Sequence, residues 1–339
     1  MNLSSIPTPF FALAPMDDVT DTVFRQIVSE AAPPDVFFTE FVNVDGLQSP
    51  GRPKLLRKLR FDPSERSLIA QIWGKDPENF YKTAQQIADG TFARELGLPE
   101  GINFAGIDLN MGCPVKDVVK NGICSALIND RELAGEIIGA TRDGLADKLP
   151  LSVKTRLGFN EIDMTWIEFL LKQKLNMLTI HGRTRKEMSK VPCHWDEIGK
   201  ARELRDRLAP ETVIVGNGDV KDRAHGEELA RRYNLDGIMI GRGIFEDPFA
   251  FARRSPWPGY AAGQKIALYK KHVELFIQTW EEGERPIVTL NKFCKVYING
   301  FPNAKETREQ LMYAASASEL LDKLNSLLAE EAKQPAILG

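Results

Sequence analysis

Apolar residues in this chain gather in short β-rich runs, and each run is followed by a longer segment with apolar residues at helical spacing. This alternation is typical of βα units around a parallel sheet. The predicted strands are 10–16, 36–42, 67–74, 106–110, 151–156, 177–183, 212–219 and 237–243. Runs such as LSVKTR and TVIVGNG are almost wholly apolar before their last residues, which indicates strands buried on both faces.

Eight such strands within about 250 residues predict an α/β fold, the TIM (β/α)8 barrel. The alternative is an open doubly wound sheet, but no Gly-x-Gly-x-x-Gly turn follows the first strand. A Pro/Gly-rich stretch at 255–259 breaks the pattern, and helical periodicity then continues to Glu331. We therefore predict a barrel domain over residues 1–257 and a small C-terminal all-helical domain over residues 258–339.

Composition narrows the class of protein. The 339 residues are 43% hydrophobic and 27% charged, with no apolar run long enough to cross a bilayer and no basic-then-apolar leader at the N-terminus. We expect a cytoplasmic protein with reduced thiols, because four cysteines are too few for a disulfide framework. The net charge of −3 gives no overall attraction for nucleic acid, so any RNA contact requires local basic patches.

Polar residues at the ends of apolar strands are the candidates for chemistry, since a TIM barrel places its active site there. Lys154 lies inside such a strand, which is costly unless the side chain faces the barrel mouth. It could form a Schiff base, place a cation beside an anionic cofactor, or pair structurally with Glu40 or Asp108. His181 ends the sixth strand, where we expect it to contact a ligand rather than only to pack.

Two glycine-containing turns end the last two strands. They read Asn217-Gly218-Asp219 and Gly241-Arg242-Gly243. Barrels often bind phosphate at this place through backbone N–H groups, although either turn alone could simply be a tight βα connection. The pair together favours a phosphate site.

Cys113 follows the fourth strand in a Gly-Cys-Pro loop, where a thiol can act as a nucleophile or a general acid. The other three cysteines, Cys124, Cys193 and Cys294, lack such a placement and are interpreted as structural. Cys193 and His194 are adjacent, which suits a tetrahedral zinc site poorly. We predict no metal.

The order and spacing of several motifs carry a family resemblance over nearly the whole chain. These motifs are APM, QIWG, DLNMGCPVKDVVKNG, SVKTRLG, TIHGRTR, NGD, GRG and the tail LNKFCKVYINGFPNAKETREQLM. The sequence resembles the tRNA-dihydrouridine synthases, flavin-dependent enzymes that reduce uridines in tRNA. The resemblance implies FMN at the barrel mouth, NADPH or NADH as the reductant, tRNA as the partner, and a helical domain that helps to hold tRNA. We expect no membrane association and no obligatory protein partner.

The resemblance also implies roles for particular residues. The flavin ring and ribityl chain would contact Pro15, Met16, Gln71, Lys154 and His181, and the phosphate end would contact Asn217, Gly218, Asp219, Gly241 and Arg242. Hydride from reduced FMN would reach C6 of the uracil, Cys113 would give the proton to C5, and Asn110 would position the base. The uridine must be flipped out of the folded RNA to reach this site.

Basic clusters near the expected barrel mouth would grip the RNA backbone. Arg57 and Lys58 belong to a run without acids after the second predicted strand, and Arg183 begins a cluster after the sixth. The sequence departs from the family pattern at Asn121-Gly-Ile-Cys124 and at 189–195, which bears on the target uridine rather than on the reaction.

Two other functions fit parts of the sequence. One is an FMN-dependent barrel oxidoreductase for a small pyrimidine-like molecule. The helical tail and the basic clusters argue against this function. The other is a tRNA-binding or folding protein without essential catalysis. The presence of Cys113 and Lys154 argues against this function.

Overall fold

The β-rich runs form one parallel sheet that curves round into a barrel in the computed structural model, which describes residues 6–65 and 67–333. Its strands are β1 (Phe10–Leu13), β2 (Phe37–Phe38), β3 (Val42–Asn43), β4 (Leu68–Trp73), β5 (Gly106–Met111), β6 (Leu151–Gly158), β7 (Met177–Thr184), β8 (Val213–Asn217) and β9 (Gly237–Ile240). The order is β1-β9-β8-β7-β6-β5-β4-β2, with β3 also on β4. Between β1 and β2 the barrel closes through a parallel bridge from Ala12 to Val36, where Leu13 N donates to Val36 O at 3.1 Å. The TIM-barrel prediction is confirmed.

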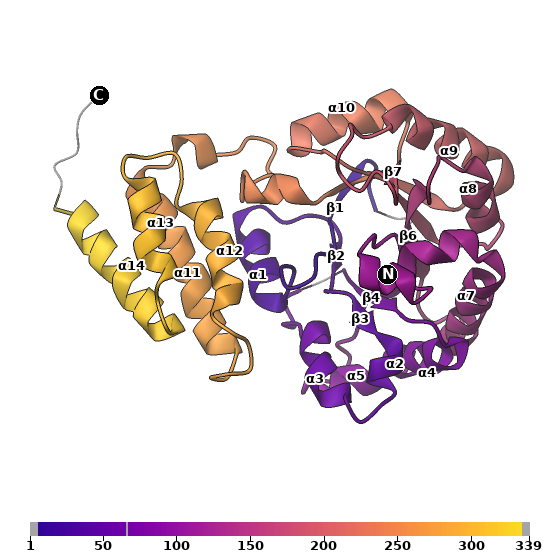
Figure 1. Cartoon of the computed structure of the whole chain (residues 1–339), viewed down its shortest axis with the longest axis horizontal. Helices are drawn as coiled ribbons and strands as arrows, with labels where there is room; N and C mark the ends of the chain where they lie inside the picture. The colour runs from indigo at the N-terminus through magenta and orange to yellow at the C-terminus, as the bar shows by residue number, and fades with distance from the viewer. Residues whose placement is uncertain (1–5, 66, 334–339) are drawn as a thin grey trace. The chain divides into compact units, whose positions relative to one another are not determined.

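Helices surround the strands of this barrel (Figure 1). They are α2 (Val44–Leu47), α3 (Arg52–Leu56), α4 (Pro77–Ala88), α5 (Thr91–Glu95), α6 (Lys116–Lys120), α7 (Arg131–Leu145), α8 (Met164–Leu171), α9 (Trp195–Leu208) and α10 (Arg223–Tyr233). Aspartates begin several of them, because a side-chain carboxylate accepts first-turn N–H groups that have no helical partner. Asp76, Asp130, Asp163 and Asp222 cap α4, α7, α8 and α10 in this way.

The second predicted strand is interrupted in the middle. Thr39 N still donates to Ile69 O, at 3.0 Å, but the N–H of Gln71 donates to the hydroxyl of Thr39 instead of a main-chain oxygen. A side chain thus replaces one backbone acceptor of the ladder, and pairing resumes only at β3. The uninterrupted strand over 36–42 was therefore a wrong prediction in its middle.

The chain separates into two compact units, and both are discontinuous in sequence. One contains residues 1–22 and 34–242, and the other contains residues 23–33 and 243–339. The second is helical, as expected for the tail: its main elements are α1 (Thr22–Ala31), α11 (Ala262–Thr279), α12 (Val288–Tyr297), α13 (Ala304–Met312) and α14 (Ala317–Glu331). The domain boundary between residues 257 and 258 stays a prediction.

Aromatic side chains explain why the segment 23–33 belongs with the C-terminal helices. Phe24 of α1 stacks on Phe293 of α12, with ring centroids 4.8 Å apart, and on His272 of α11, at 6.0 Å. His272 is fully buried, and its Nδ1 lies 3.0 Å from the hydroxyl of Tyr297.

Among the helices that the structure describes, none is long and apolar enough to cross a membrane.

Candidate functional site

The carboxyl ends of neighbouring strands bring the expected site residues together. In the parallel register, Asn110 of β5 lies beside Lys154 of β6, and His181 of β7 lies beside Asn217 of β8. Gln71 of β4 lies beside Asp108 of β5. Side chains that the sequence separates by more than a hundred residues therefore share one end of the barrel, the end where TIM barrels carry out chemistry.

A hydrogen-bonded row of polar side chains runs beneath this end. Asp108, completely buried, accepts from the Ser152 hydroxyl at 2.6 Å and from Gln71 Nε2 at 2.7 Å. Gln71 Oε1 in turn accepts from Asn110 Nδ2 at 3.1 Å. Burial raises the pKa of Asp108 to about 6, against the opposing effects of these hydrogen bonds and of Lys154, so the group is a carboxylate at neutral pH.

Asn110 holds the loop that carries Cys113. Its Oδ1 accepts from the N–H groups of Gly112, at 3.2 Å, and Cys113, at 3.0 Å. The carbonyl of Cys113 accepts from the Ser125 hydroxyl at 2.7 Å. The thiol of Cys113 is thus mounted on a backbone fixed from both sides, and its side chain is half-buried.

Hydrogen bonding from the thiol of Cys124 is the main reason that the pKa of Cys113 falls to about 7. The Val115 N–H and the Arg156 charge act in the same direction, whereas partial burial opposes them. Burial raises the pKa of Cys124 well above its ordinary value, so Cys124 stays a thiol and can donate. Cys124 also has a left-handed φ of 56°, a conformation that glycine adopts more readily.

Cations cluster beside the thiol. Loss of hydration, with added repulsion from Arg156, lowers the pKa of Lys154 to about 8. Burial and the charges of Arg156, Lys154, Arg183 and Arg242 lower the pKa of His181 well below its ordinary value, so its imidazole is neutral at pH 7. A place where several cations repel one another, and where histidine stays neutral, is electrostatically prepared for an anion.

Arg156 also has a structural role in this cluster. Its guanidinium donates to the carbonyl oxygens of Gly112, at 2.7 Å, Thr184, at 3.1 Å, and Met188, at 2.9 Å. It therefore joins the Cys113 loop to the segment after β7. No sequence motif marks Arg156 for this role, and its position two residues after Lys154 is the only signal in the sequence.

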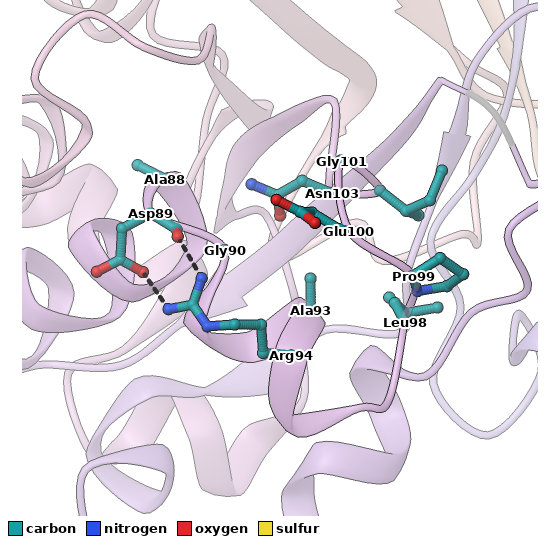
Figure 2. Close-up of a pocket in the computed structure, with 11 residues that line it drawn as sticks. Ala88, Asp89, Gly90, Ala93, Arg94, Leu98, Pro99, Glu100, Gly101 and Asn103 are labelled. Carbon is teal, nitrogen blue, oxygen red and sulfur yellow. Dashed lines mark hydrogen bonds and ion pairs between the residues drawn. The ribbon is translucent and has the colours of Figure 1, made fainter.

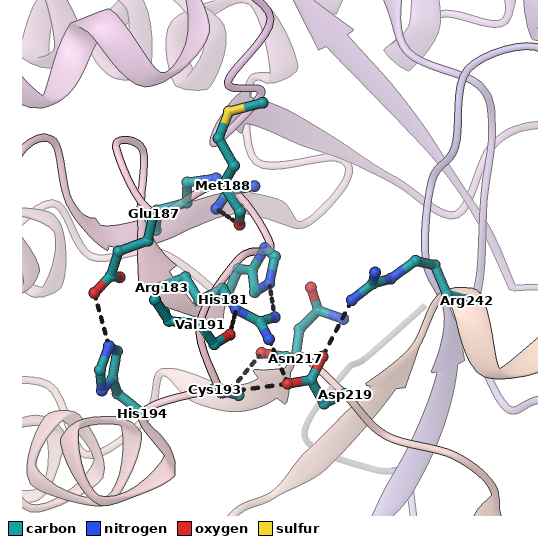
Figure 3. Close-up of polar contacts among 11 residues, drawn as sticks. His181, Arg183, Glu187, Met188, Val191, Cys193, His194, Asn217, Asp219 and Arg242 are labelled. Atoms are coloured by element: carbon teal, nitrogen blue, oxygen red, sulfur yellow. Dashed lines mark hydrogen bonds and ion pairs between the residues drawn. The ribbon is translucent and has the colours of Figure 1, made fainter.

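Figure 3 shows the charged network at the ends of β7 and β8. Arg183 is 2% exposed; it donates to Val191 O at 2.6 Å, lies 3.3 Å from His181 Nε2, and forms an ion pair with Asp219. Arg242 approaches the other oxygen of Asp219 at 3.1 Å. Because Arg183 already has these partners, its expected contact with the substrate stays a prediction.

The turn at Gly218 requires glycine. Its φ is 128°, and a Cβ there would lie 2.7 Å from Cys193 Sγ. Asn217 donates from Nδ2 to Met239 O at 2.9 Å, which ties β8 to β9. The Gly241 turn is close to the residue that follows β1, since an added Cβ would lie 3.5 Å from that of Ala14. The two turns expected to hold phosphate are therefore neighbours.

The remaining expected residues lie in segments that leave the mouth end of β1 and β3. Pro15 and Met16 are half-buried, and Met16 N donates to the Thr20 hydroxyl at 2.9 Å. Arg57 and Lys58 begin a short 3-10 helix after α3. Lys58 forms an ion pair with Asp17, so the basic run is partly neutralised within the protein.

The geometry separates Cys193 from His194. Cys193 Sγ donates to Asn217 O at 3.6 Å, whereas His194 Nε2 lies 2.9 Å from Glu187 Oε1. Among the described residues, only Asp17, Asp18 and Glu40 gather carboxylates closely enough to resemble a metal site, and Glu40 accepts from the Asp18 N–H at 2.7 Å. That no metal is needed stays a prediction.

A hollow of about 500 Å³ lies at the opposite end of the barrel, in the connection from α4 to β5 (Figure 2). Arg94 lines one side of it, donating to Asp89 O at 2.9 Å and to the Thr91 hydroxyl at 3.0 Å. Connections that lead into the amino-terminal ends of barrel strands serve stability rather than catalysis. We place no chemistry there.

Comparisons with known proteins identify the family of this chain. The family model described as "Dihydrouridine synthase (Dus)" matches residues 12–334. "Probable tRNA-dihydrouridine synthase" of Staphylococcus aureus (strain COL) is 45% identical over 336 residues, which is 97% of each chain. "Probable tRNA-dihydrouridine synthase 2" of Bacillus subtilis (strain 168) is 44% identical over 318 residues, which is 93% of each chain. A solved histamine dehydrogenase from Rhizobium sp. 4-9 shares the fold at 13% identity, with a TM-score of 0.51 over 94% of this chain and 62% of that one. Because the family match and both named relatives extend over nearly the whole chain, this protein belongs to the dihydrouridine synthase family.

Proposed function

We propose that this enzyme reduces the C5=C6 bond of particular uridines in tRNA to 5,6-dihydrouridine, with FMN at the barrel mouth and NADPH or NADH as the source of electrons. The observation that carries the proposal is the register of β5 and β6. It sets Lys154 beside Asn110, the residue whose amide holds the backbone of Cys113. A cation for a flavin thereby lies on β6, and a thiol for a proton transfer lies on the loop that follows the adjacent strand β5.

The residues present fit an anionic, phosphate-bearing cofactor. Lys154 and the guanidinium groups of Arg183 and Arg242 supply positive charge, and Gly218 leaves its backbone open to close approach. FMN bound here would supply the hydride that reduces C6 of the uracil. We assign Gln71, Lys154 and His181, with Pro15 and Met16, to its ring and ribityl side, and the turns at Asn217–Asp219 and Gly241–Arg242 to its phosphate.

Asp219 serves this phosphate end indirectly. A carboxylate repels a phosphate, so Asp219 is better suited to holding the two arginines than to touching the ligand. It pairs with Arg183 through one oxygen and with Arg242 through the other. Arg242 is the more exposed of the two and is the one we assign to the phosphate.

Cys113 is the proton donor in this proposal. It must be a thiol when the hydride arrives at C6, so that its proton can pass to C5. Its pKa of about 7 suits a general acid at neutral pH, because such a group is neither fully deprotonated nor reluctant to give up its proton. Asn110 holds this thiol in place and lies near enough to the loop to contact the base as well.

tRNA would be held by basic groups on the same side of the barrel. Arg57 and Lys58 follow β3, and the connections that follow strands lie at the mouth end. Contacts from such side chains to phosphates depend on salt and carry no sequence information, so they fix the position of the RNA while the site selects the flipped base.

The test is nucleoside mass spectrometry of tRNA that lacks dihydrouridine, before and after incubation with the purified protein, FMN and NADPH. Dihydrouridine, two mass units above uridine, should appear at defined positions, and Cys113→Ala should give none while still binding FMN. If the tRNA is unchanged although the protein binds FMN and oxidises NADPH, the proposed substrate is wrong and a small pyrimidine-like substrate takes its place.

A further inference from the structure

We propose that Asp108 is a positioning residue: through Gln71 and Asn110, it fixes the direction of two side-chain amides and thereby the backbone of the Cys113 loop. The inference rests on the proposed function only in naming Cys113 as the proton donor. Asp108 itself is completely buried, so its effect passes through its neighbours.

The direction of the row follows from donor and acceptor chemistry. A carboxylate can only accept, so Asp108 requires the NH2 end of Gln71 to face it, at 2.7 Å. The oxygen end of Gln71 then faces Asn110 and accepts from its Nδ2 at 3.1 Å. The oxygen of Asn110 is left to face the loop, where it accepts from the N–H groups of Gly112 and Cys113. Reversing either amide would oppose two donors or two acceptors.

The row also decides what the amides can offer to ligands. It uses both side-chain oxygens as acceptors, together with one N–H of Gln71 and one N–H of Asn110. Each amide keeps a second N–H. The oxygen of Asn110 already accepts two hydrogen bonds, so Asn110 presents only a donor to whatever lies beside it, whereas the oxygen of Gln71 keeps one acceptor site. Donors match carbonyl oxygens and unprotonated ring nitrogens, the acceptors of a flavin and of uracil, and they mismatch the amino group of cytosine.

An ionised carboxylate at a fully buried position is costly, as the raised pKa of Asp108 shows, so a purely space-filling role is a poor account of it. A second account is that Asp108 simply balances the charge of Lys154, which lies on the neighbouring strand β6. The positioning role, the charge-balancing role and the space-filling role predict different behaviour for two substitutions.

Asp108→Asn removes the charge but keeps an acceptor oxygen. Its Oδ1 can face Gln71 while its amide faces Ser152, because the Ser152 hydroxyl can instead donate to Ile107 O, now at 3.3 Å. Asp108→Leu keeps the branched shape of the side chain, with methyl groups in place of the two oxygens, and removes the acceptor. Positioning predicts a loop like the wild type in Asp108→Asn and a loosened loop in Asp108→Leu. Charge balance predicts that both variants are altered, and space filling predicts that neither is.

The experiment measures amide hydrogen exchange of the peptide that contains Gly112 and Cys113, in full-length protein, with peptides from α7 and α14 as controls for folding. Asp108→Leu should speed exchange of this peptide about tenfold, which corresponds to loss of roughly one hydrogen bond at about 1.4 kcal/mol. Asp108→Asn should stay within about twofold of the wild type.

Asn110→Ala breaks the same row at its last step and completes a double-mutant cycle. If Asp108 acts through Asn110, Asp108→Leu combined with Asn110→Ala should exchange no faster than Asn110→Ala alone. If Asp108→Leu does not fold, Gln71→Met interrupts the row from its middle and takes its place in the cycle. Multiplying effects in the double variant, or wild-type exchange in the single variants, would overturn the proposal. The readout needs no tRNA, so it stands apart from failure of the proposed reaction.

Discussion

Replacing Cys124 with glycine tests the electrostatic account of the Cys113 thiol. The contact with Cys124 is the largest cause of the low pKa of Cys113. Glycine removes that donor, and it also suits the left-handed backbone at this position, where φ is 56°. The variant should therefore fold, and any change in Cys113 reports the lost hydrogen bond.

The expected size follows from the strength of a hydrogen bond to a charged group, about 1.5–3 kcal/mol, or roughly one to two pH units. Water entering the space left by the side chain replaces part of this, so we expect the pKa of Cys113 to rise from about 7 to about 8. The thiolate fraction at pH 7 then falls about fivefold. A more basic thiolate is also about threefold more nucleophilic, so the rate at a single pH changes little.

The informative assay is the alkylation rate of Cys113 by iodoacetamide between pH 5 and pH 10, followed by mass spectrometry of the Cys113 peptide. Cys124→Gly should move the midpoint of the profile upward by about one pH unit and raise its alkaline plateau about threefold. Cys124→Ser keeps a donor and should stay near the wild-type midpoint, and Cys294→Ala, in the helical unit, is the control. An unmoved midpoint in Cys124→Gly refutes the assignment of the low pKa to this contact.

Four further results are expected. Cys113→Ala should retain FMN binding and NADPH oxidation but form no dihydrouridine in the tRNA mass assay; full product formation would exclude Cys113 as the acid. FMN binding at pH 8 should take up part of a proton, because the anion raises the pKa of Lys154 from about 8. Calorimetry in buffers of different ionisation enthalpy should show a smaller uptake in Lys154→Met, and an unchanged uptake would exclude Lys154 as its source. Arg57→Glu with Lys58→Glu should weaken tRNA binding most at low salt and leave the flavin spectrum unchanged; equal binding would assign both side chains to plain surface. Burial lowers the pKa of His272 to about 3, so between about pH 6.5 and pH 3 only the unfolded chain takes up a proton at this residue. The free energy of unfolding should therefore fall as the pH drops, by about 2 kcal/mol at pH 5. In urea unfolding, His272→Asn should lack this contribution to the pH dependence of the free energy of unfolding.

Strand positions were predictable because a buried parallel strand must be apolar on both faces, and each predicted run contains a strand of the barrel. The break in the second run was not, because it depends on the Thr39 hydroxyl replacing a backbone acceptor. The packing of α1 against the C-terminal helices could not be predicted from the sequence either. An amphipathic helix after the first strand has the same pattern whether its apolar face meets a barrel or, as with Phe24, other helices.

The candidate site was predictable to the extent that residue type and strand end define it. Three polar or reactive residues stand in or directly after apolar strands, and each can be identified as a candidate by itself: Cys113, Lys154 and His181. The roles of Asp108, Arg156 and Cys124 depend on which groups they meet across strands and loops, and no spacing in one sequence states that. The ion pairs of Asp219 with Arg183 and Arg242 could not be predicted for the same reason, and its place at the phosphate end stays a prediction.

The same buried groups affect both the binding of an anionic cofactor and the protonation of Cys113. Burial and the neighbouring cations lower the pKa of His181 and keep its imidazole neutral, and the same cations make the site ready for an anion. Arg156 belongs to this cluster and also lowers the pKa of Cys113, while its guanidinium holds the carbonyl of Gly112. Binding of an anion would offset part of this positive field and raise the pKa of the thiol. Cys113 would then become more fully protonated when the anionic cofactor is in place, which is the state that a proton donor to C5 requires.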